Sequence, residues 1–338
     1  MMALSRHPER SEGPSAAADG EDSSPAAQDD IIQQINQLRR ERDAIILAHN
    51  YQVPEIQDLA DFTGDSLALA RRAAATDNPL IVLCGVHFMA ETASILCPDK
   101  TVLLPDLEAG CSLAASITAE QLRKWKAQFP GAVVVSYVNT SAEVKAESDY
   151  CCTSGNAVQV VQAVPEDREI LFLPDMFLGA HVERVTGRKM RVWLGECHVH
   201  AGIDVPALEA LAKQHPRAEA LIHPECGCTT PALYLAGEGK LPLPIKVLST
   251  EGMVKYAASS PAAEFLVATE IGILHRLRQQ APAKKFLPVN PRASCHFMKR
   301  ITLEKVRDAL AYNQHVIDVP ADVAQRARLP IERMTAIG

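Results

Sequence analysis

The stretch RVWLGECHVHAG, residues 191–202, joins an apolar strand pattern to one thiol and two imidazoles. Residues 191–194 predict a buried strand, and Cys197, His198 and His200 crowd onto the turn that leaves it. A local two-cysteine motif would need a second cysteine beside Cys197, and the sequence has none there. We therefore expect a parallel sheet with chemical groups at the end of a strand, and partners for Cys197 elsewhere in the chain.

The overall composition is that of a globular chain. Of its 338 residues, 47% are apolar and 22% are charged, and this length suffices for two or three compact domains. No run approaches the roughly 18 apolar residues of a membrane span, and no basic-then-apolar signal peptide is present, so we expect a cytoplasmic protein with no membrane partner. A net charge of -7 without basic runs argues against a nucleic acid partner.

The chain has nine cysteines, which we expect to be free thiols or metal ligands rather than disulfides. This expectation follows because the cytosol keeps most thiols reduced, and the odd count agrees with it. Cys84 and Cys97 lie in or beside apolar runs and are expected to be plain core residues.

The character of the sequence changes after residue 29. Residues 1–29 are rich in Ser, Ala, Gly, Pro and acidic residues, which predicts a disordered tail. From Ile31 onward, short apolar runs alternate with amphipathic segments, a pattern typical of a parallel α/β sheet with crossover helices. The predicted strands span residues 44–48, 80–84, 101–104, 132–138, 169–173, 191–194, 220–223, 245–248 and 264–268.

These predicted strands fall into three sets of about three. One cysteine in an irregular segment follows each set: Cys111, Cys197 and Cys295. The separations are 197 − 111 = 86 and 295 − 197 = 98 residues, about one small α/β unit each. Three such units related by approximate threefold symmetry would bring the three thiols towards one central point.

Nearly every predicted strand ends in polar groups. Ligand sites of open α/β sheets lie beyond the carboxyl ends of the strands, where such groups would meet. The ends read HNYQ (49–52), GVHF (85–88), PD (105–106), YVNTS (137–141), PD (174–175), GECHVH (195–200), HPECG (223–227), STEG (249–252) and TEIG (269–272). A scaffold that needed only stability would not require so many groups that donate protons, accept them or bind anions.

Several motifs in series resemble the quinolinate synthase family. They are ILAHNYQVPEIQDLADFTGDS, YVNTSAEVKAESDYCCTSGNAV, HPECG, VLSTEGM and FLVATEIGILHRL, together with the three isolated cysteines. Each string alone is a weak signal, but in this order and spacing they are highly specific, and they cover the chain from about Ile31 to Met334. The resemblance implies condensation of iminoaspartate with dihydroxyacetone phosphate to quinolinate, phosphate and water, in NAD biosynthesis.

The resemblance also implies an α/β architecture of three pseudo-threefold-related α/β/α domains with short parallel sheets around a central active site. We expect these domains at residues 30–111 with 296–338, at 112–198 and at 199–295. Cys111, Cys197 and Cys295 would hold a [4Fe-4S] cluster. Four thiolates suit such a cluster to electron transfer, whereas three leave one iron open to polarise a substrate oxygen.

The resemblance assigns four residues at the first strand ends to the substrate. His49 and Tyr51 are expected to bind it and transfer protons, roles for which a near-neutral imidazole and a phenol are suited. Tyr137, also a candidate catalytic residue, and Asn139 leave a buried strand with polar tips and match family site positions. The competing interpretation for all four is a structural polar group satisfied by the backbone.

Four further residues lie near predicted helix starts, where free N–H groups bind carboxylate and phosphate. We expect Ser66 both to cap its helix and to bind substrate, and Ser154 either to cap a helix or to bind an anion. By resemblance, Ser249 and Thr250 bind the phosphate of the triose.

The central turns supply the last three site residues. By resemblance, His200 contacts substrate rather than iron, and His223 contacts the phosphate or the bound intermediate. Glu225 is assigned acid/base chemistry beside the open iron. His198 has no family counterpart and is expected to be structural.

The sequence departs from some family members around the third cysteine. Arg292 and Met298 stand three positions before and after Cys295, so the CxxCxxC disulfide of those members is not available here. Cys151, Cys152, Cys226 and Cys228 are extra cysteines.

Two other classes of protein stay open at this point. A zinc hydrolase would use Cys226, Cys228, His223 and His200 as mixed ligands. An iron-sulfur sensor would use the three isolated cysteines but not the anion-binding strand ends. For the enzyme, L-aspartate oxidase or aspartate dehydrogenase would be the functional partner that supplies iminoaspartate.

Overall fold

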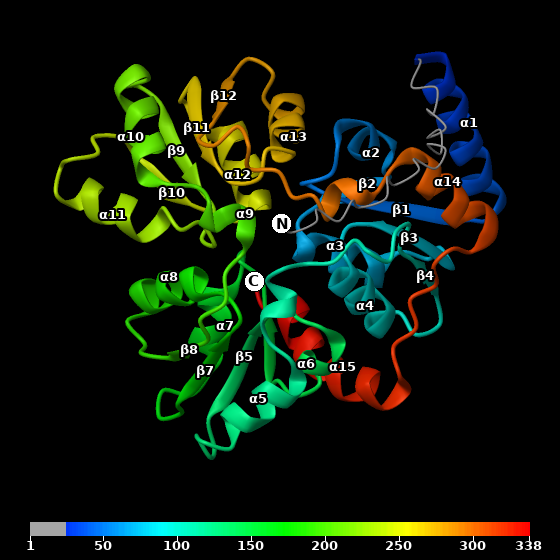
Figure 1. Cartoon of the computed structure of the whole chain (residues 1–338), viewed down its shortest axis with the longest axis horizontal. Helices are drawn as coiled ribbons and strands as arrows, with labels where there is room; N and C mark the ends of the chain where they lie inside the picture. Colours follow the sequence, from blue (N-terminus) through cyan, green and yellow to red (C-terminus); the bar gives the residue numbers. More distant parts are fainter. Residues whose placement is uncertain (1–24) are drawn as a thin grey trace, which may run out of the picture.

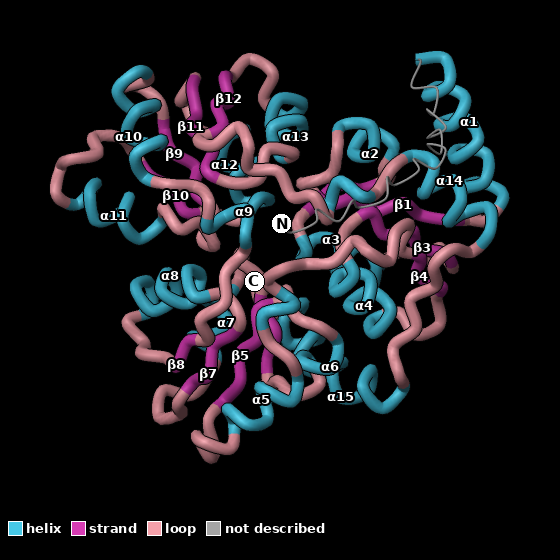
Figure 2. Tube along the Cα trace, in the orientation of Figure 1, coloured by secondary structure: helices cyan, strands magenta, loops and turns pink. Residues whose placement is uncertain are grey.

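The computed structural model describes residues 25–338. Figure 1 shows three lobes arranged around a common centre, and Figure 2 shows that each lobe contains one sheet with helices packed on its sides. Every sheet has four strands, all paired in parallel. The described part of the chain therefore confirms the α/β class and the three repeated units.

The three sheets share one strand order. The first contains β1 (Ala44–His49), β2 (Phe62–Gly64), β3 (Leu80–Cys84) and β4 (Thr101–Leu103), ordered β2-β1-β3-β4. The second contains β5 (Val133–Tyr137), β6 (Tyr150–Cys152), β7 (Ile170–Leu173) and β8 (Arg191–Val192), ordered β6-β5-β7-β8. The third contains β9 (Glu219–Ile222), β10 (Ile245–Val247), β11 (Glu264–Ala268) and β12 (Lys285–Pro288), ordered β10-β9-β11-β12. Equivalent strand ends in the three lobes therefore carry equivalent loops.

All nine predicted strands are present, but three edge strands were missed. The missed strands β2, β6 and β12 have three or four residues each and lie at sheet edges, so their apolar runs are too short to predict a strand. The prediction of a buried strand over residues 191–194 was wrong in detail. β8 ends at Val192 and is an edge strand, and Leu194 is 80% exposed.

The helices follow from local caps and amphipathic patterns. The side chains of Asp65, Asp175 and Ser249 each accept the backbone N–H three residues further on, which satisfies a donor that the first helical turn leaves unpaired. Within residues 25–338, we find no helix with both the length and the apolar character needed to cross a bilayer. The helices are α1 (Pro25–Glu41), α2 (Pro54–Leu59), α3 (Ser66–Ala75), α4 (His87–Leu96), α5 (Ala119–Lys126), α6 (Ala142–Lys145), α7 (Ala157–Ala163), α8 (Met176–Thr186), α9 (His198–Ala201), α10 (Val205–Gln214), α11 (Thr229–Gly237), α12 (Thr250–Ser259), α13 (Ile273–Gln280), α14 (Leu303–Tyr312) and α15 (Ala321–Ala336).

The two ends of the described chain pack on the first two lobes. Helix α1 begins at Pro25, so residues 25–29 are helical and not part of a disordered tail, while residues 1–24 of the predicted tail lie outside the described residues. Helix α1 packs on α14, and α15 contacts β6 and α6 as well as α3 and α4. The domain limits at 111, 198 and 295 stay a prediction, and α15 bridges the first two of those units.

Asn156 attaches the C-terminal segment to the second lobe. It is 1% exposed, and its Oδ1 accepts the N–H of Thr153 at 2.7 Å. Its Nδ2 donates to the carbonyls of Met334 at 2.9 Å and Ile337 at 2.8 Å. One buried amide therefore satisfies three backbone groups from segments far apart in the sequence.

Asn156→Ala is expected to lower the free energy of unfolding by about 2–4 kcal/mol, because several buried backbone groups lose their partner at once. Thermal unfolding followed by circular dichroism measures the effect as a drop of several degrees in Tm. Asn78→Ala is the control, since the bonds of Asn78 to Asp43 are exposed. Equal Tm values for the two variants would show that Asn156 does not hold the C-terminal segment.

Candidate active site

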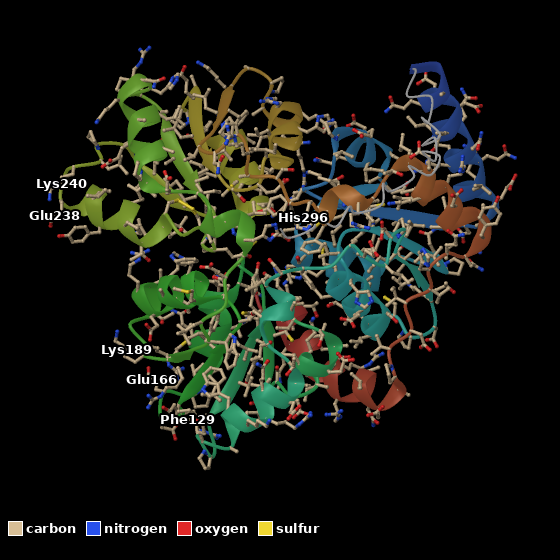
Figure 3. All side chains as sticks on the ribbon, viewed as in Figure 1. Phe129, Glu166, Lys189, Glu238, Lys240 and His296 are labelled. Atoms are coloured by element: carbon tan, nitrogen blue, oxygen red, sulfur yellow. A yellow bond between two sulfur atoms is a disulfide. The ribbon has the colours of Figure 1, made fainter. Side chains whose placement is uncertain are left out.

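A single cavity occupies the centre of the three lobes, at the carboxyl ends of the strands. Its open volume is about 700 Å³, and residues from all three lobes line it. Figure 3 shows the labelled His296 near this centre, whereas the other labelled residues lie on the periphery. Thirteen of the fourteen predicted site residues line the cavity: His49, Tyr51, Ser66, Cys111, Tyr137, Asn139, Ser154, Cys197, His200, His223, Glu225, Thr250 and Cys295.

Three cysteines reach the cavity from equivalent places in the three lobes. Cys111, Cys197 and Cys295 follow β4, β8 and β12, the outer strands at the same end of each sheet. All three are free and half-buried. Burial raises the pKa of Cys111 and Cys295, and the nearby Cys197 sulfur raises both further. Three neighbouring thiols, one from each lobe, are the donor set that a bound iron-sulfur cluster needs, so the residues present fit such a group.

The other cysteines lie away from the cavity. Cys84 and Cys97 are buried in the core as predicted, and Cys151 and Cys152 are buried in β6. The remaining two, Cys226 and Cys228, are buried and joined as a disulfide, with a Cα–Cα distance of 5.2 Å. The expectation that no disulfide is present was therefore wrong for this pair. The zinc ligand set built on these two sulfurs is contradicted as well, because each sulfur is bonded to the other.

Glu225 is the centre of a buried polar cluster. It is 3% exposed, and its Oε1 accepts a hydrogen bond from the Tyr137 hydroxyl. Its Oε2 lies 3.1 Å from Nδ1 of His200, and Oε1 lies 3.9 Å from Nδ1 of His223. The thiol of Cys197 joins this cluster, since single ligand atoms of Cys197, His200 and Glu225 lie within 4.8 Å of one another. The acid/base candidate is thus next to a predicted cluster ligand.

The neighbours of these buried groups set their charges. Burial alone would raise the pKa of Glu225, but the adjacent histidines and a phenol hydroxyl lower it to about 2. Burial lowers the pKa of His223 and of His49 to about 3 each. Burial would also lower the pKa of His200, but Cys197 and Glu225 raise it well above its usual value. At neutral pH, the site therefore contains a carboxylate and an imidazolium beside two neutral imidazoles.

Tyr51 and His49 form one wall of the cavity, and Thr269 fixes Tyr51 in place. The Tyr51 hydroxyl lies 2.6 Å from Thr269 Oγ1 and 3.3 Å from Nε2 of His200. Thr269 Oγ1 is also 2.9 Å from that histidine nitrogen. The rings of His49 and Tyr51 meet edge to face at 4.7 Å. Sequence reasoning noted the TEIG strand end but assigned no role to Thr269, although its position after β11 was the available signal.

Two of the predicted helix-start residues are not caps. Asp65, not Ser66, caps α3, so the expected capping role of Ser66 was wrong, and Ser66 is the first helical residue. The residue before α7 is Asn156, so Ser154 is not a cap either. Ser154 instead places its hydroxyl 3.2 Å from Nε2 of His223. Both serines still line the cavity, where their hydroxyls are available to an anion.

Ser249 and Thr250 differ in what they reach. Ser249 caps α12 by accepting the Gly252 N–H, and its hydroxyl donates to Asp65 at 3.1 Å. It is the one predicted site residue that does not line the cavity. Thr250 does line it, and its Oγ1 accepts a hydrogen bond from Asn50 at 2.8 Å. Of the two residues, only Thr250 is therefore placed to reach a ligand in the cavity.

Two polar atoms at the cavity lack a well-aligned partner among residues 25–338. They are Oδ1 of Asn139 and Nδ1 of His200, whose approach to Glu225 at 3.1 Å is not well aligned for a hydrogen bond. Both are inaccessible to solvent, and a buried polar atom without a partner is costly. Both atoms belong to residues that line the cavity.

Comparison with known proteins identifies the family of this chain. The family model described as quinolinate synthetase A protein matches residues 33–336. The chain is 60% identical to a quinolinate synthase of Thermus thermophilus, over 91% of this chain and 97% of the relative. It is 60% identical to that of Mycobacterium sp. strain KMS, over 90% and 91%, and 57% identical to that of Mycobacterium tuberculosis strain H37Ra, over 90% and 88%. With matches along almost its whole length, the chain belongs to the quinolinate synthetase A family.

Proposed function

We propose that this chain condenses iminoaspartate with dihydroxyacetone phosphate to form quinolinate, phosphate and water. The observation that carries the proposal is the convergence of Cys111, Cys197 and Cys295, one from each sheet, on a cavity that also contains the Glu225 cluster. The relatives named quinolinate synthase and the matched family support the same reaction. Neither the zinc hydrolase nor the iron-sulfur sensor accounts for both features.

Cys111, Cys197 and Cys295 would hold a [4Fe-4S] cluster. Three protein thiolates leave one iron without a cysteine ligand, and such a group supplies a Lewis acid that polarises a substrate oxygen for dehydration. The half-buried position of the three thiols at the cavity wall supports this assignment.

Glu225 is proposed to move protons during the condensation. Its carboxylate has the Tyr137 hydroxyl on one oxygen and His200 beside the other, so the three groups form a connected path along which a proton can pass. Forming the new carbon–carbon bond from the enamine form of iminoaspartate requires loss of a proton, and the later dehydration requires proton delivery to oxygen. Burial excludes bulk water from these transfers.

The remaining residues are proposed to bind and orient the substrates. His49 and Tyr51 line the cavity. Asn139 lines it too, and its side-chain oxygen has no hydrogen-bond partner among residues 25–338. The hydroxyls of Ser66 and Ser154 are proposed to contact carboxylate or phosphate oxygens. His223 remains neutral, and its Nε2 contacts the Ser154 hydroxyl, which suits it to orient that hydroxyl towards the anion.

Thr250 and the first turn of α12 are proposed to bind the phosphate of dihydroxyacetone phosphate. Thr250 lines the cavity at the start of a ten-residue helix, where backbone N–H groups favour an anion. Ser249 supports this turn as its cap rather than through contact. The role of Ser249 is therefore indirect.

Thr250→Val is expected to raise the KM for dihydroxyacetone phosphate, because it removes the hydroxyl while keeping the branched shape. The loss in kcat/KM should be about 1–3 kcal/mol, the range for a hydrogen bond to a charged group, with little change in the KM for iminoaspartate. Steady-state kinetics with each substrate varied in turn measure it. An unchanged KM for the phosphate substrate would remove Thr250 from the phosphate site.

An anaerobic assay of the reconstituted protein tests the proposed function directly. Quinolinate should appear only when both substrates are present, and phosphate should be released in equal amount. Iminoaspartate can be generated in the assay by L-aspartate oxidase or aspartate dehydrogenase, the two enzyme classes that we propose as functional partners, with the cytoplasm as the shared location. Iron-loaded protein that yields neither product would overturn the proposal.

A further inference from the structure

Glu270 is a buried carboxylate at the cavity for which the proposed reaction gives no role. It follows β11 in the third lobe, lines the cavity and is 0% exposed. Burying a carboxylate is expensive unless several donors compensate it. A buried carboxylate therefore needs well-placed donors. The residues that donate to Glu270 show which segments of the chain it holds together.

Three donors converge on the Glu270 carboxylate. Oε1 accepts the backbone N–H of Cys295 at 3.1 Å and lies 3.1 Å from Nζ of Lys299. Oε2 accepts the backbone N–H of Gly272 at 2.6 Å. One side chain thus binds the loop of the third cysteine, the segment leading into α13, and a lysine four residues beyond that cysteine.

Lys299 extends this network to the first lobe. Its ammonium group also donates to the backbone carbonyl of Tyr51. The Tyr51 hydroxyl, at the other end of the residue, contacts Thr269, the neighbour of Glu270. Tyr51 is therefore fixed at both its backbone and its side chain by the segment that also fixes Cys295.

Gly272 shows how closely these groups are packed. A Cβ atom at Gly272 would lie 2.7 Å from the Tyr51 carbonyl oxygen and 2.8 Å from both Glu270 Oε2 and Lys299 Nζ. All three distances are shorter than real Cβ contacts, so only glycine allows the two lobes to approach this closely here. The Gly272 carbonyl also accepts a hydrogen bond from Gln57 of the first lobe at 2.9 Å.

We propose that Glu270 and Lys299 form a positioning pair that holds Cys295 and Tyr51 in a fixed mutual arrangement across the junction of the third and first lobes. Neither residue is a catalytic residue in this inference, which rests on the proposed function for the roles of Cys295 and Tyr51. An ordinary structural ion pair would contribute only to stability. A positioning pair affects cluster retention and substrate affinity beyond any effect on folding.

The carboxylate is needed because all three of its partners are donors. In Glu270→Gln, the amide keeps one acceptor oxygen but directs an NH₂ group at a second donor, so at least one of the backbone N–H groups loses its partner. In Lys299→Met, the two backbone N–H contacts of Glu270 remain, while the ion pair with Glu270 and the link to Tyr51 are lost. The two variants therefore separate the Cys295 branch from the Tyr51 branch.

The test uses full-length protein with its cluster, purified without oxygen. Iron release to a ferrous chelator is timed, and kcat and KM are measured for both substrates. Glu219→Gln is the matched control, since Glu219 is in the third sheet and accepts hydroxyls of Tyr256 and Ser260 at the opposite ends of the strands. It reports loss of carboxylate hydrogen bonds in the same lobe without touching the cavity.

For Glu270→Gln, iron release should be at least about tenfold faster than for Glu219→Gln, as expected when a buried bond that orients a ligand is lost. For Lys299→Met, iron should be retained. The KM for the substrates should rise about tenfold, because the charge-assisted hydrogen bond from Lys299 to the Tyr51 carbonyl is lost. The double variant should release iron no faster than Glu270→Gln alone, because both residues act in one network. If Glu270→Gln fails to fold, Lys299→Met still tests the Tyr51 branch, because Lys299 is only half-buried.

Iron release and KM values in both variants equal to those of Glu219→Gln would overturn the positioning role. A wild-type protein that retains iron but forms no quinolinate would overturn the proposed function alone, and the iron-release comparison would still decide the Cys295 branch. A wild-type protein that binds no iron after reconstitution would overturn both.

Discussion

Cys197→Ser is expected to lose most of its iron and nearly all activity. The remaining thiolates, Cys111 and Cys295, come from two different lobes, and two ligands cannot hold a four-iron cluster firmly. Iron and acid-labile sulfide per chain, measured after anaerobic reconstitution, should fall from about four towards zero. The same result is expected for serine at Cys111 or at Cys295, because the three positions are equivalent in the repeated fold.

The matched control is the double variant Cys226→Ser with Cys228→Ser. These sulfurs are buried, bonded to each other and absent from the cavity lining. The loop they close is so short that its disulfide constrains the unfolded chain little, so iron content and most of the activity should persist. Full iron in Cys197→Ser, or its loss in the double variant, would refute the ligand set and place the metal elsewhere.

Glu225→Gln is expected to reduce kcat by about two or more orders of magnitude, because the amide cannot accept or return a proton. The substitution keeps the size of the side chain and one acceptor oxygen for the Tyr137 hydroxyl. Substrate affinity should therefore change far less than kcat. Pre-steady-state and steady-state rates of quinolinate formation measure the effect in protein with normal iron content.

Two controls make the Glu225 result specific. Iron content must match the wild type, since Glu225 lies near the Cys197 sulfur and a lost cluster would mimic a lost base. Glu219→Gln, remote from the cavity, should keep its normal kcat. A Glu225→Gln protein with full iron and near-normal kcat would exclude Glu225 from proton transfer.

The sequence alone was sufficient to predict the repeated α/β architecture. Apolar runs separated by amphipathic segments report the alternation of strand and helix, and this signal is local. The spacing of Cys111, Cys197 and Cys295 added the threefold relation, because equivalent loops follow equivalent strands. Polar strand ends then indicated the cavity, since parallel strands direct all their carboxyl ends to one edge.

The short edge strands could not be predicted from this local pattern. β2, β6 and β12 have only three or four residues each, too few for an apolar run to indicate a strand. Their positions are set by hydrogen bonds to the neighbouring strand, which is a long-range contact. The end of β8 at Val192 was likewise not visible in the apolar run over residues 191–194.

Individual side-chain partners were decided only by the tertiary structure. Asp65 rather than Ser66 caps α3, and the hydroxyl of Ser249 turns to Asp65, 184 residues away in the sequence. Thr269 and Glu270 gained their roles in the same way, through contacts with Tyr51 and Cys295.

The difference between what the sequence determined and what the tertiary structure decided has a physical cause. Hydrophobic periodicity and strand ends are properties of a few consecutive residues, so the sequence determined the fold class and the strand ends that surround the cavity. The resemblance to a known family added the individual site residues. Which donor meets which acceptor depends on how the three lobes pack together, and this packing places Glu225 beside Tyr137, 88 residues away in the sequence. Only the tertiary structure could therefore decide the Glu225 cluster and the link between Glu270 and Lys299.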